Sequence, residues 1–144
     1  MIPSLRFQPH RDSVNGLGFS PDSTMLATAS NDNTCKLFDL RRRREITTLR
    51  GHLLSLFSVC FSPDGHRLAA RTGGTGTTSS GIIIWDLETE REVLFLETHE
   101  TRFGMVRFHA SGDSLLSISR SALRLWRAPS WEEIAAAEAK EKTQ

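Results

Sequence analysis

The sequence is poor in cysteine. Only Cys35 and Cys60 occur among 144 residues, and both lie within apolar segments that read as strands. They lack the paired spacing that structural zinc ligands adopt. We therefore expect two buried, reduced thiols rather than a disulfide. The sequence predicts no metal and no cofactor.

Long apolar runs are also missing. No segment approaches the ~20 consecutive apolar residues that a membrane-spanning helix needs. The first residues, Met1 to Ser4, lack the charged-then-apolar layout of a signal peptide. The formal net charge of +1 argues against a chain built as a whole to bind nucleic acid. These absences predict a cytoplasmic protein that binds neither membrane nor nucleic acid.

The chain contains one sequence pattern that occurs three times, at intervals of roughly 45 residues. Each copy opens on a histidine and continues with an apolar stretch that ends in phenylalanine. A turn and a second apolar run follow, and an aromatic residue closes the copy. The repeated positions are His10, His52 and His99, then Phe19, Phe61 and Phe108, and finally Phe38-Asp39, Trp85-Asp86 and Trp126-Arg127.

This period, with its histidine opening and Trp-Asp close, resembles the WD-repeat β-propeller family over residues 4 to 127. The resemblance implies an all-β fold of four-stranded antiparallel blades within residues 1–128. The blades are expected at about 10–50, 51–97 and 98–128. Alternating polar and apolar residues predict the strands. Their expected ranges are 14–19, 25–30, 34–39, 46–50, 56–61, 67–72, 82–86, 93–97, 103–108, 115–119 and 123–127.

The expected strands do not fill three closed blades. The third unit has no outer strand, because Pro129 ends its sheet, whereas residues 4–9 read as an outer strand without a blade. In the family that the chain resembles, the N-terminal strand completes the last blade. Three blades are too few for a ring, since propellers have about four to eight. We therefore expect completion in trans by head-to-tail assembly. A dimer is favoured over a trimer, and another WD-repeat chain or a larger parent protein is the alternative.

Residues 129–144 are predicted to form a C-terminal helix. Ser130 and Glu133 have the spacing of a capping box. Trp131, Ile134 and Ala135 share one face of that helix, which would cover the edge of the last blade or dock a partner. The tail also resembles the terminus of bacterial multi-blade WD-repeat regions.

The resemblance gives the repeated histidines a structural role rather than a catalytic or metal-binding one. In such blades the histidine bonds an aspartate in the turn between the second and third strands, and a hydroxyl and the closing tryptophan complete the network. No unit has the full set, because Phe38 replaces tryptophan in the first and the other turns lack aspartate. The assigned residues are His10, Ser30 and Asp32, then His52, Thr72 and Trp85, and finally His99, Ser119 and Trp126.

Two further motifs have weaker implications. The run Arg41–Arg44 resembles a phosphate- or nucleic-acid-binding patch, but no aromatic residues interleave it, and a solvated turn is favoured. The glycine-rich segment 72–81 lacks the Gly-Lys-Ser/Thr ending of a phosphate-binding loop. We interpret it as a lengthened hairpin loop, with partner recognition as the alternative.

The sequence favours a non-catalytic scaffold that binds a protein or peptide. The residues best placed for contact flank the repeated histidines or lie in hairpin loops of the same face, and their arginines suit an acidic or phosphorylated partner. One alternative is a C-terminal sensor or targeting segment of a larger protein such as a bacterial kinase. A hydrolase is the least favoured. The predicted contact residues are Arg11, Asp12, Asn31, Leu53, Leu54, Arg71, Arg102 and Arg120.

Overall fold

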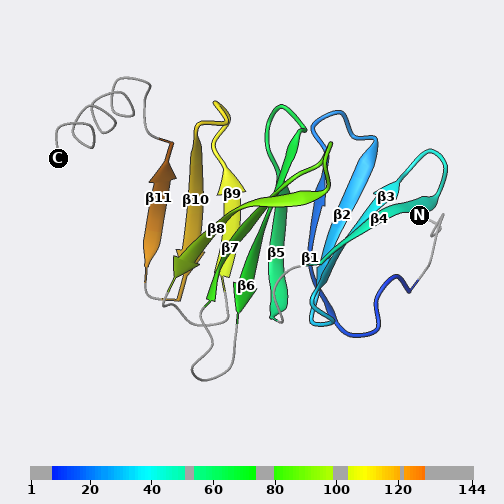
Figure 1. Cartoon of the computed structure of the whole chain (residues 1–144), viewed down its shortest axis with the longest axis horizontal. Coiled ribbons are helices and arrows are strands. Elements are labelled where there is room, and N and C mark those ends of the chain that lie inside the picture. The colour runs from blue at the N-terminus through cyan, green and yellow to red at the C-terminus, as the bar shows by residue number, and fades with distance from the viewer. Residues whose placement is uncertain (1–7, 51–53, 74–79, 99–103, 121, 129–144) are drawn as a thin grey trace, which may run out of the picture.

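Eleven strands form three antiparallel sheets in the part of the chain that the structure describes (Figure 1). The computed structural model describes residues 8–50, 54–73, 80–98, 104–120 and 122–128. The first sheet has the order β1-β2-β3-β4, the second β5-β6-β7-β8, and the third β11-β10-β9. The strands are β1 Val14–Phe19, β2 Met25–Ser30, β3 Thr34–Asp39, β4 Arg44–Arg50, β5 Ser55–Phe61, β6 Arg67–Gly73, β7 Ser80–Asp86, β8 Arg91–Thr98, β9 Gly104–Phe108, β10 Ser114–Ser119 and β11 Leu123–Arg127.

These strands confirm the ranges expected between residues 14 and 127, with small differences at some ends. The outer strands begin earlier than expected, at Arg44 and Arg91, because a bulge lets polar residues continue the ladder. Residues 4–7 of the strand expected at 4–9 lie outside the described residues, and so does the helix expected at 129–144. Gln8 and Pro9, at the end of the expected 4–9 strand, are not in a strand.

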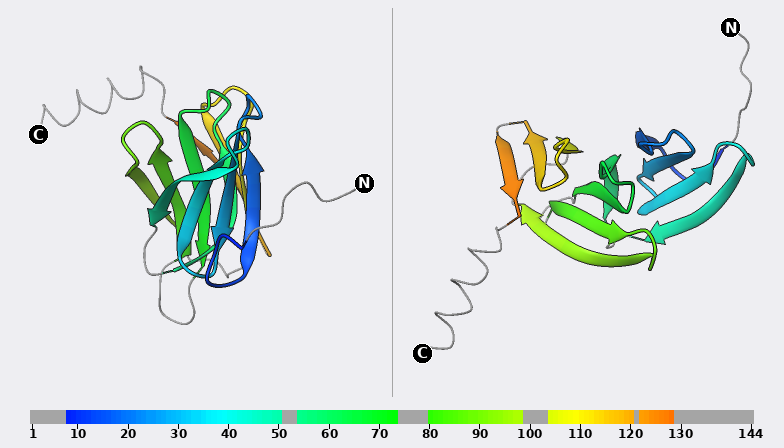
Figure 2. Two further views of the ribbon diagram at one scale, coloured as in Figure 1. Left: turned by 90° about the vertical axis from the view of Figure 1, so that its right-hand side faces the viewer. Right: turned by 90° about the horizontal axis from the view of Figure 1, so that it is seen from above.

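The three sheets stand face to face as an open fan (Figure 2). Their first strands, β1, β5 and β9, lie side by side along the inner side of the fan, and β4 and β8 follow its outer side. The first and third sheets occupy the two ends. We call each sheet a blade, its face toward the next blade in sequence the front, and the opposite face the back.

The core consists of two layers. Each layer lies between the front of one blade and the back of the next blade. In the first layer, Ala27, Cys35 and Leu37 of the first blade pack against the back of the second, which carries Phe61 and Trp85. In the second layer, the front of the second blade packs against the back of the third. The residues of this second layer are Cys60, Ala69, Ile82, Ile84, Val106 and Leu115, with Phe108 and Trp126 partly buried beside them. The middle blade therefore buries mainly apolar side chains on both faces.

Glycine on the front of β1 lets the inner strands approach closely. A Cβ added to Gly16 would lie 2.9 Å from the carbonyl oxygen of Phe57 and 2.9 Å from the Cα of Ser58, both in β5. Real Cβ atoms do not come this close to backbone, so any side chain here would push the first two blades apart.

A capped turn follows the inner strand in every blade. Ser20 donates a hydrogen bond to Oδ1 of Asp22 at 2.6 Å, and Ser62 does the same to Asp64 at 2.5 Å. These bonds lower the pKa of both aspartates. The backbone then turns through a left-handed residue, which is Gly65 (φ 77°) and Gly112 (φ 79°) in the later blades but Ser23 (φ 60°) in the first.

We predict that Ser23→Gly stabilises the protein by about 0.5–1 kcal/mol, because the left-handed conformation is costly for a residue with a Cβ. The matched variant Gly65→Ser is expected to lower the free energy of unfolding by a similar amount. Urea unfolding of the two variants and the wild type measures both effects. Destabilisation by Ser23→Gly would contradict the prediction.

Candidate functional site

The loops at one end of the fan hold most of the residues that the sequence singled out. This loop end, at the lower edge of Figure 1, comprises the segment before β1, the β2–β3 turn, the segment before β5 and the β10–β11 turn. The opposite end carries the capped turns and the β3–β4 and β7–β8 turns. The arginine run lies there, with Arg41, Arg42 and Arg43 exposed, as expected of a solvated turn.

His10 is the centre of a buried polar network in the first blade. Its Nδ1 lies 3.0 Å from Oδ2 of Asp32 and 3.1 Å from the Thr34 hydroxyl. Its Nε2 lies 2.7 Å from the hydroxyl of Thr28. Because the carboxylate only accepts, Nδ1 donates its proton toward Asp32.

Asp32 connects this histidine to the backbone of two loops. It accepts hydrogen bonds from the N–H groups of Arg11 and Thr34, each at 3.0 Å. Burial opposes ionisation of Asp32, but the hydrogen bonds from Thr34, Arg11 and His10 outweigh it and lower its pKa to about 2. The network therefore fastens the segment before β1 to the β2–β3 turn.

The hydroxyls expected in the networks serve a different purpose. Ser30 accepts a hydrogen bond from the N–H of Asp32 at 3.1 Å, and Ser119 accepts one from the N–H of Ala122 at 3.1 Å. Thr72, at the same position of the second blade, accepts from the N–H of Gly81 at 3.0 Å. All three join the second strand of a blade to its third, at the turn between them.

The hydroxyl groups that bond a histidine or tryptophan ring lie two residues before these, on the same face of the second strand. Thr28 bonds His10, and Ser117 accepts the indole N–H of Trp126 at 2.9 Å. Ala70 takes this position in the second blade and has no hydroxyl to offer Trp85. Two hydroxyl residues two apart share one face of a strand, so the pattern did not distinguish them. Register does, because Leu115 pairs with Trp126 and brings Ser117 beside the indole.

Most of the predicted contact residues that the structure describes lie at the surface of the loop end. Arg11, Asp12 and Arg120 are exposed, and Asn31 and Leu54 are half-buried. Leu53 and Arg102 lie outside the described residues, as do the network residues His52 and His99.

Arg71 is a correction, because it is fully buried and offers no contact surface. It lies in the middle of β6, paired with Ile82, and so belongs to the front of the second blade. Its side chain reaches under β9, where a Cβ on Gly104 would lie 2.5 Å from Nε of Arg71. Counting from the turn suggested a loop position, but alternation along β6 directs the side chain into the layer between blades.

Asn15 is a residue of the loop end that the sequence analysis missed. Its side-chain amide donates to Oδ1 of Asn31 at 2.7 Å and to the carbonyl oxygen of Leu56 at 2.9 Å. It therefore joins the turn of the first blade to the inner strand of the second. A polar residue near the start of an apolar strand was the available signal.

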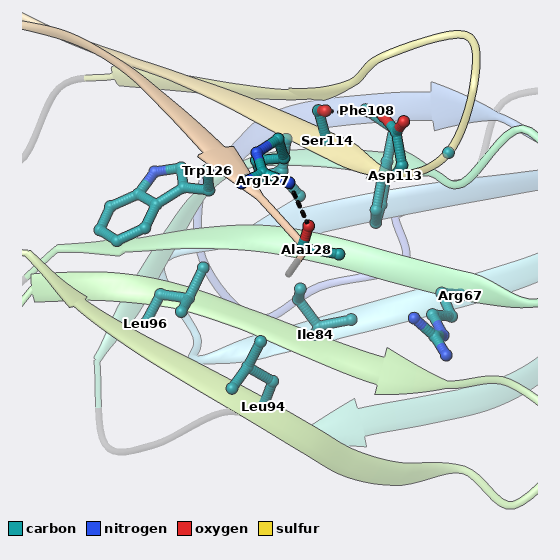
Figure 3. A pocket seen from close by; sticks show the side chains of 12 residues that line it. Arg67, Ile84, Leu94, Leu96, Phe108, Asp113, Ser114, Trp126, Arg127 and Ala128 are labelled. Carbon is teal, nitrogen blue, oxygen red and sulfur yellow. Dashed lines mark hydrogen bonds between the residues drawn. The ribbon is translucent and has the colours of Figure 1, made fainter. Parts of the chain in front are cut away.

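A cavity of about 330 Å³ lies between the second and third blades, on the side of β8 and β11 (Figure 3). Leu94, Leu96 and Trp126 line it, with Arg67 and Asp113 among its polar residues. Among the described residues, no three His, Cys, Asp or Glu side chains gather into a possible metal site. The cavity is therefore a largely apolar gap beside β11, the last strand of its described sheet.

The glycine-rich segment joins two neighbouring antiparallel strands. Thr72 of β6 pairs with Gly81 of β7, which confirms a hairpin connection rather than the strand-to-helix turn of a phosphate-binding loop. Residues 74–79 lie outside the described part. No helix within the described residues has the length and apolar character required to cross a membrane.

We predict that Asp32→Asn lowers the free energy of unfolding by about 1–2 kcal/mol at pH 7, because buried partners lose a charged acceptor. The folded-state pKa of about 2 lies below the ordinary 3.8, so the carboxylate's contribution is present above pH 4 and is lost as the pH falls toward 2. Denaturant unfolding of both proteins between pH 2 and pH 7 measures the difference, which should shrink over that acid range.

The matched control is Asp12→Asn, whose carboxylate accepts one local hydrogen bond from the N–H of Ser13. It should cost less than about 0.5 kcal/mol at pH 7. Equal effects of the two substitutions would contradict the role given to Asp32.

Comparison with known proteins agrees with this architecture. The family model described as "WD domain, G-beta repeat" matches residues 2–39 and 43–86. The nuclear distribution protein nudF of Aspergillus niger is 32% identical over 124 residues, which is 83% of this chain and 27% of that protein. The guanine nucleotide-binding protein subunit beta-1 of Nicotiana tabacum is 28% identical over 130 residues, 83% of this chain and 33% of that protein.

A WD repeat, SAM and U-box domain-containing protein of Gallus gallus is 38% identical over 90 residues, 61% of this chain and 17% of that protein. The chain thus spans a third or less of the length of these curated relatives. A family model over more than half of the chain, together with a relative 32% identical across 83% of it, places the chain in the WD40 repeat family.

Proposed function

We propose that this chain is a non-catalytic scaffold whose loop end binds a protein or peptide partner. The observation that carries the proposal is the set of hydrogen bonds that polar side chains make at that end. His10, Asp32 and Asn15 hydrogen-bond the loops to one another and to the next blade. Fixed loops present exposed side chains at little entropic cost on binding.

The exposed charge of this end supports an acidic or phosphorylated partner. Arg11 and Arg120 are exposed on loops of the first and third blades. The backbone of Arg11 is held by Asp32, which leaves its guanidinium to project from a fixed position. Guanidinium groups bind carboxylates and phosphates through paired hydrogen bonds.

One specific observation favours the hydrolase alternative. Thr28, His10 and Asp32 are linked in the order of a nucleophile, a base and an orienting carboxylate. Both Thr28 and His10 are 5% exposed, so a substrate would not reach the hydroxyl. A catalytic nucleophile must meet its substrate, and we therefore keep the structural role for these residues.

The proposal includes assembly with further blades, because a propeller normally has about four to eight. We place the complete assembly in the cytoplasm, where free thiols are stable. Both cysteines are free and buried, and burial raises the pKa of the Cys60 thiol to about 11 and that of Cys35 further.

The runner-up is a C-terminal sensor or targeting segment of a larger protein, such as a bacterial kinase. The observation in its favour is the small share, 17 to 33%, of the matched relatives that the chain spans. In that case the additional blades belong to the same polypeptide.

We predict that Arg11→Glu combined with Arg120→Glu weakens partner binding at least tenfold, about 1.4 kcal/mol, because charge reversal repels an acidic partner. The full chain serves as bait, the captured partner is identified by mass spectrometry, and its dissociation constant is then measured by calorimetry.

Arg41→Glu is the matched control, since this exposed arginine lies at the opposite end of the fan. It should leave the dissociation constant unchanged. Equal affinity of the double variant and the wild type would refute the loop end as the binding surface.

A further inference from the structure

Two sheet faces of the fan are open although their side chains are apolar. Leu17 and Phe19, on the back of the first blade, are each 60% exposed. Leu123 and Leu125, on the front of the third blade, are 66% and 65% exposed, with Met105 and Ile118 beside them. Soluble proteins seldom leave such contiguous apolar surface without a partner.

The inner strand of the open back carries apolar residues at the same positions as the inner strands of the two buried backs. Strand register makes Leu17 equivalent to Val59 and Val106, since each pairs with the same position of the second strand. Val59 and Val106 are 1% and 0% exposed. Phe19 is likewise equivalent to Phe61, which is 8% exposed, and to Phe108. The first blade therefore presents a surface that a front face covers in both other blades.

The open front matches the buried fronts in the same way. Leu123 holds the position of Cys35 and Ile82, both 0% exposed. Leu125 holds that of Leu37 and Ile84, which are 3% and 8% exposed. Within the described part of the chain, the open back of the first blade thus lacks a covering front, and the open front of the third blade lacks a covering back.

The edge of the third sheet indicates the same direction of contact. Among the described residues, β11 is the last strand of a three-stranded sheet, whereas the other two sheets have a fourth strand. Those fourth strands place Leu49 and Leu96 three residues before His52 and His99. Phe7 stands at the same distance before His10. Residues 4–19 therefore repeat the sequence of an outer strand followed by the inner strand of the next blade.

We propose that a second copy of this chain docks head to tail on the third blade. The back of its first blade, with Leu17 and Phe19, covers Leu123 and Leu125 on the front of the third blade. The contact reproduces the two blade interfaces already present within the chain. Made twice, it closes a ring of six blades, within the usual range of propellers. This deepens the assembly part of the proposed function.

The experiment is the solution mass of the purified full chain, measured by light scattering after size exclusion across a concentration series. We expect twice 16.1 kDa for the wild type. Leu125→Glu and Phe19→Glu each spoil both contacts of a homodimer, so each variant alone should weaken self-association at least tenfold. Mixed together, they retain one unaltered contact, and the two-copy mass should return.

Val93→Glu is the matched control, because Val93 is 53% exposed on β8 of the middle blade, away from both open faces. It should keep the wild-type mass, and circular dichroism should show that all variants remain folded. In hydroxyl-radical footprinting, Leu17, Phe19, Leu123 and Leu125 should be protected in the wild type, and those that each single variant retains should lose this protection.

Three results would overturn the proposal. A wild-type monomer at every concentration means that blades of another polypeptide or segment cover these faces, and a threefold mass excludes the two-copy ring. Failure of the mixture to recover the two-copy mass excludes a head-to-tail contact. Partner binding by a monomer would leave the scaffold function intact, so the two proposals fail separately.

Discussion

The architecture depends on one constraint: the sheets pack face to face, and the middle sheet buries mainly apolar side chains on both of its faces. Trp85 and Phe61 cover the first blade, while Ile82 and Ile84 of the same sheet cover the third. Such a sheet is stable only between two neighbours, because its apolar area must leave water on both sides. Repetition of the pattern therefore dictates stacking, and the close approach at Gly16 follows from the same packing.

Polar groups are placed where this stacking leaves backbone unpaired. The turn aspartates Asp22 and Asp64 accept from serine hydroxyls, and Asp32 accepts from two backbone N–H groups and His10. These bonds lower the pKa of each carboxyl group. At the loop end, the bonds of Asp32 restrict how the loops can rearrange, which is the property that an interaction platform needs.

The strands could be predicted from the sequence because alternation and turn residues are local signals. Which hydroxyl meets a ring could not, since Thr28 and Ser30 share a face and only the register with the third strand separates them. The burial of Arg71 was missed for a related reason. Its closeness to the hairpin turn indicated a loop position, but its place in β6 puts it under β9, and that layer exists only once two blades have packed.

The equivalence of the end faces with the internal ones has a consequence for how such a chain can lengthen. A duplicated blade inserted anywhere in the array would meet compatible surfaces on both sides, since Val59 and Leu17 occupy one position and Ile84 and Leu125 another. The chemistry of the contact thus places no limit on blade number. Only the angle between successive sheets sets the number of blades in a closed ring.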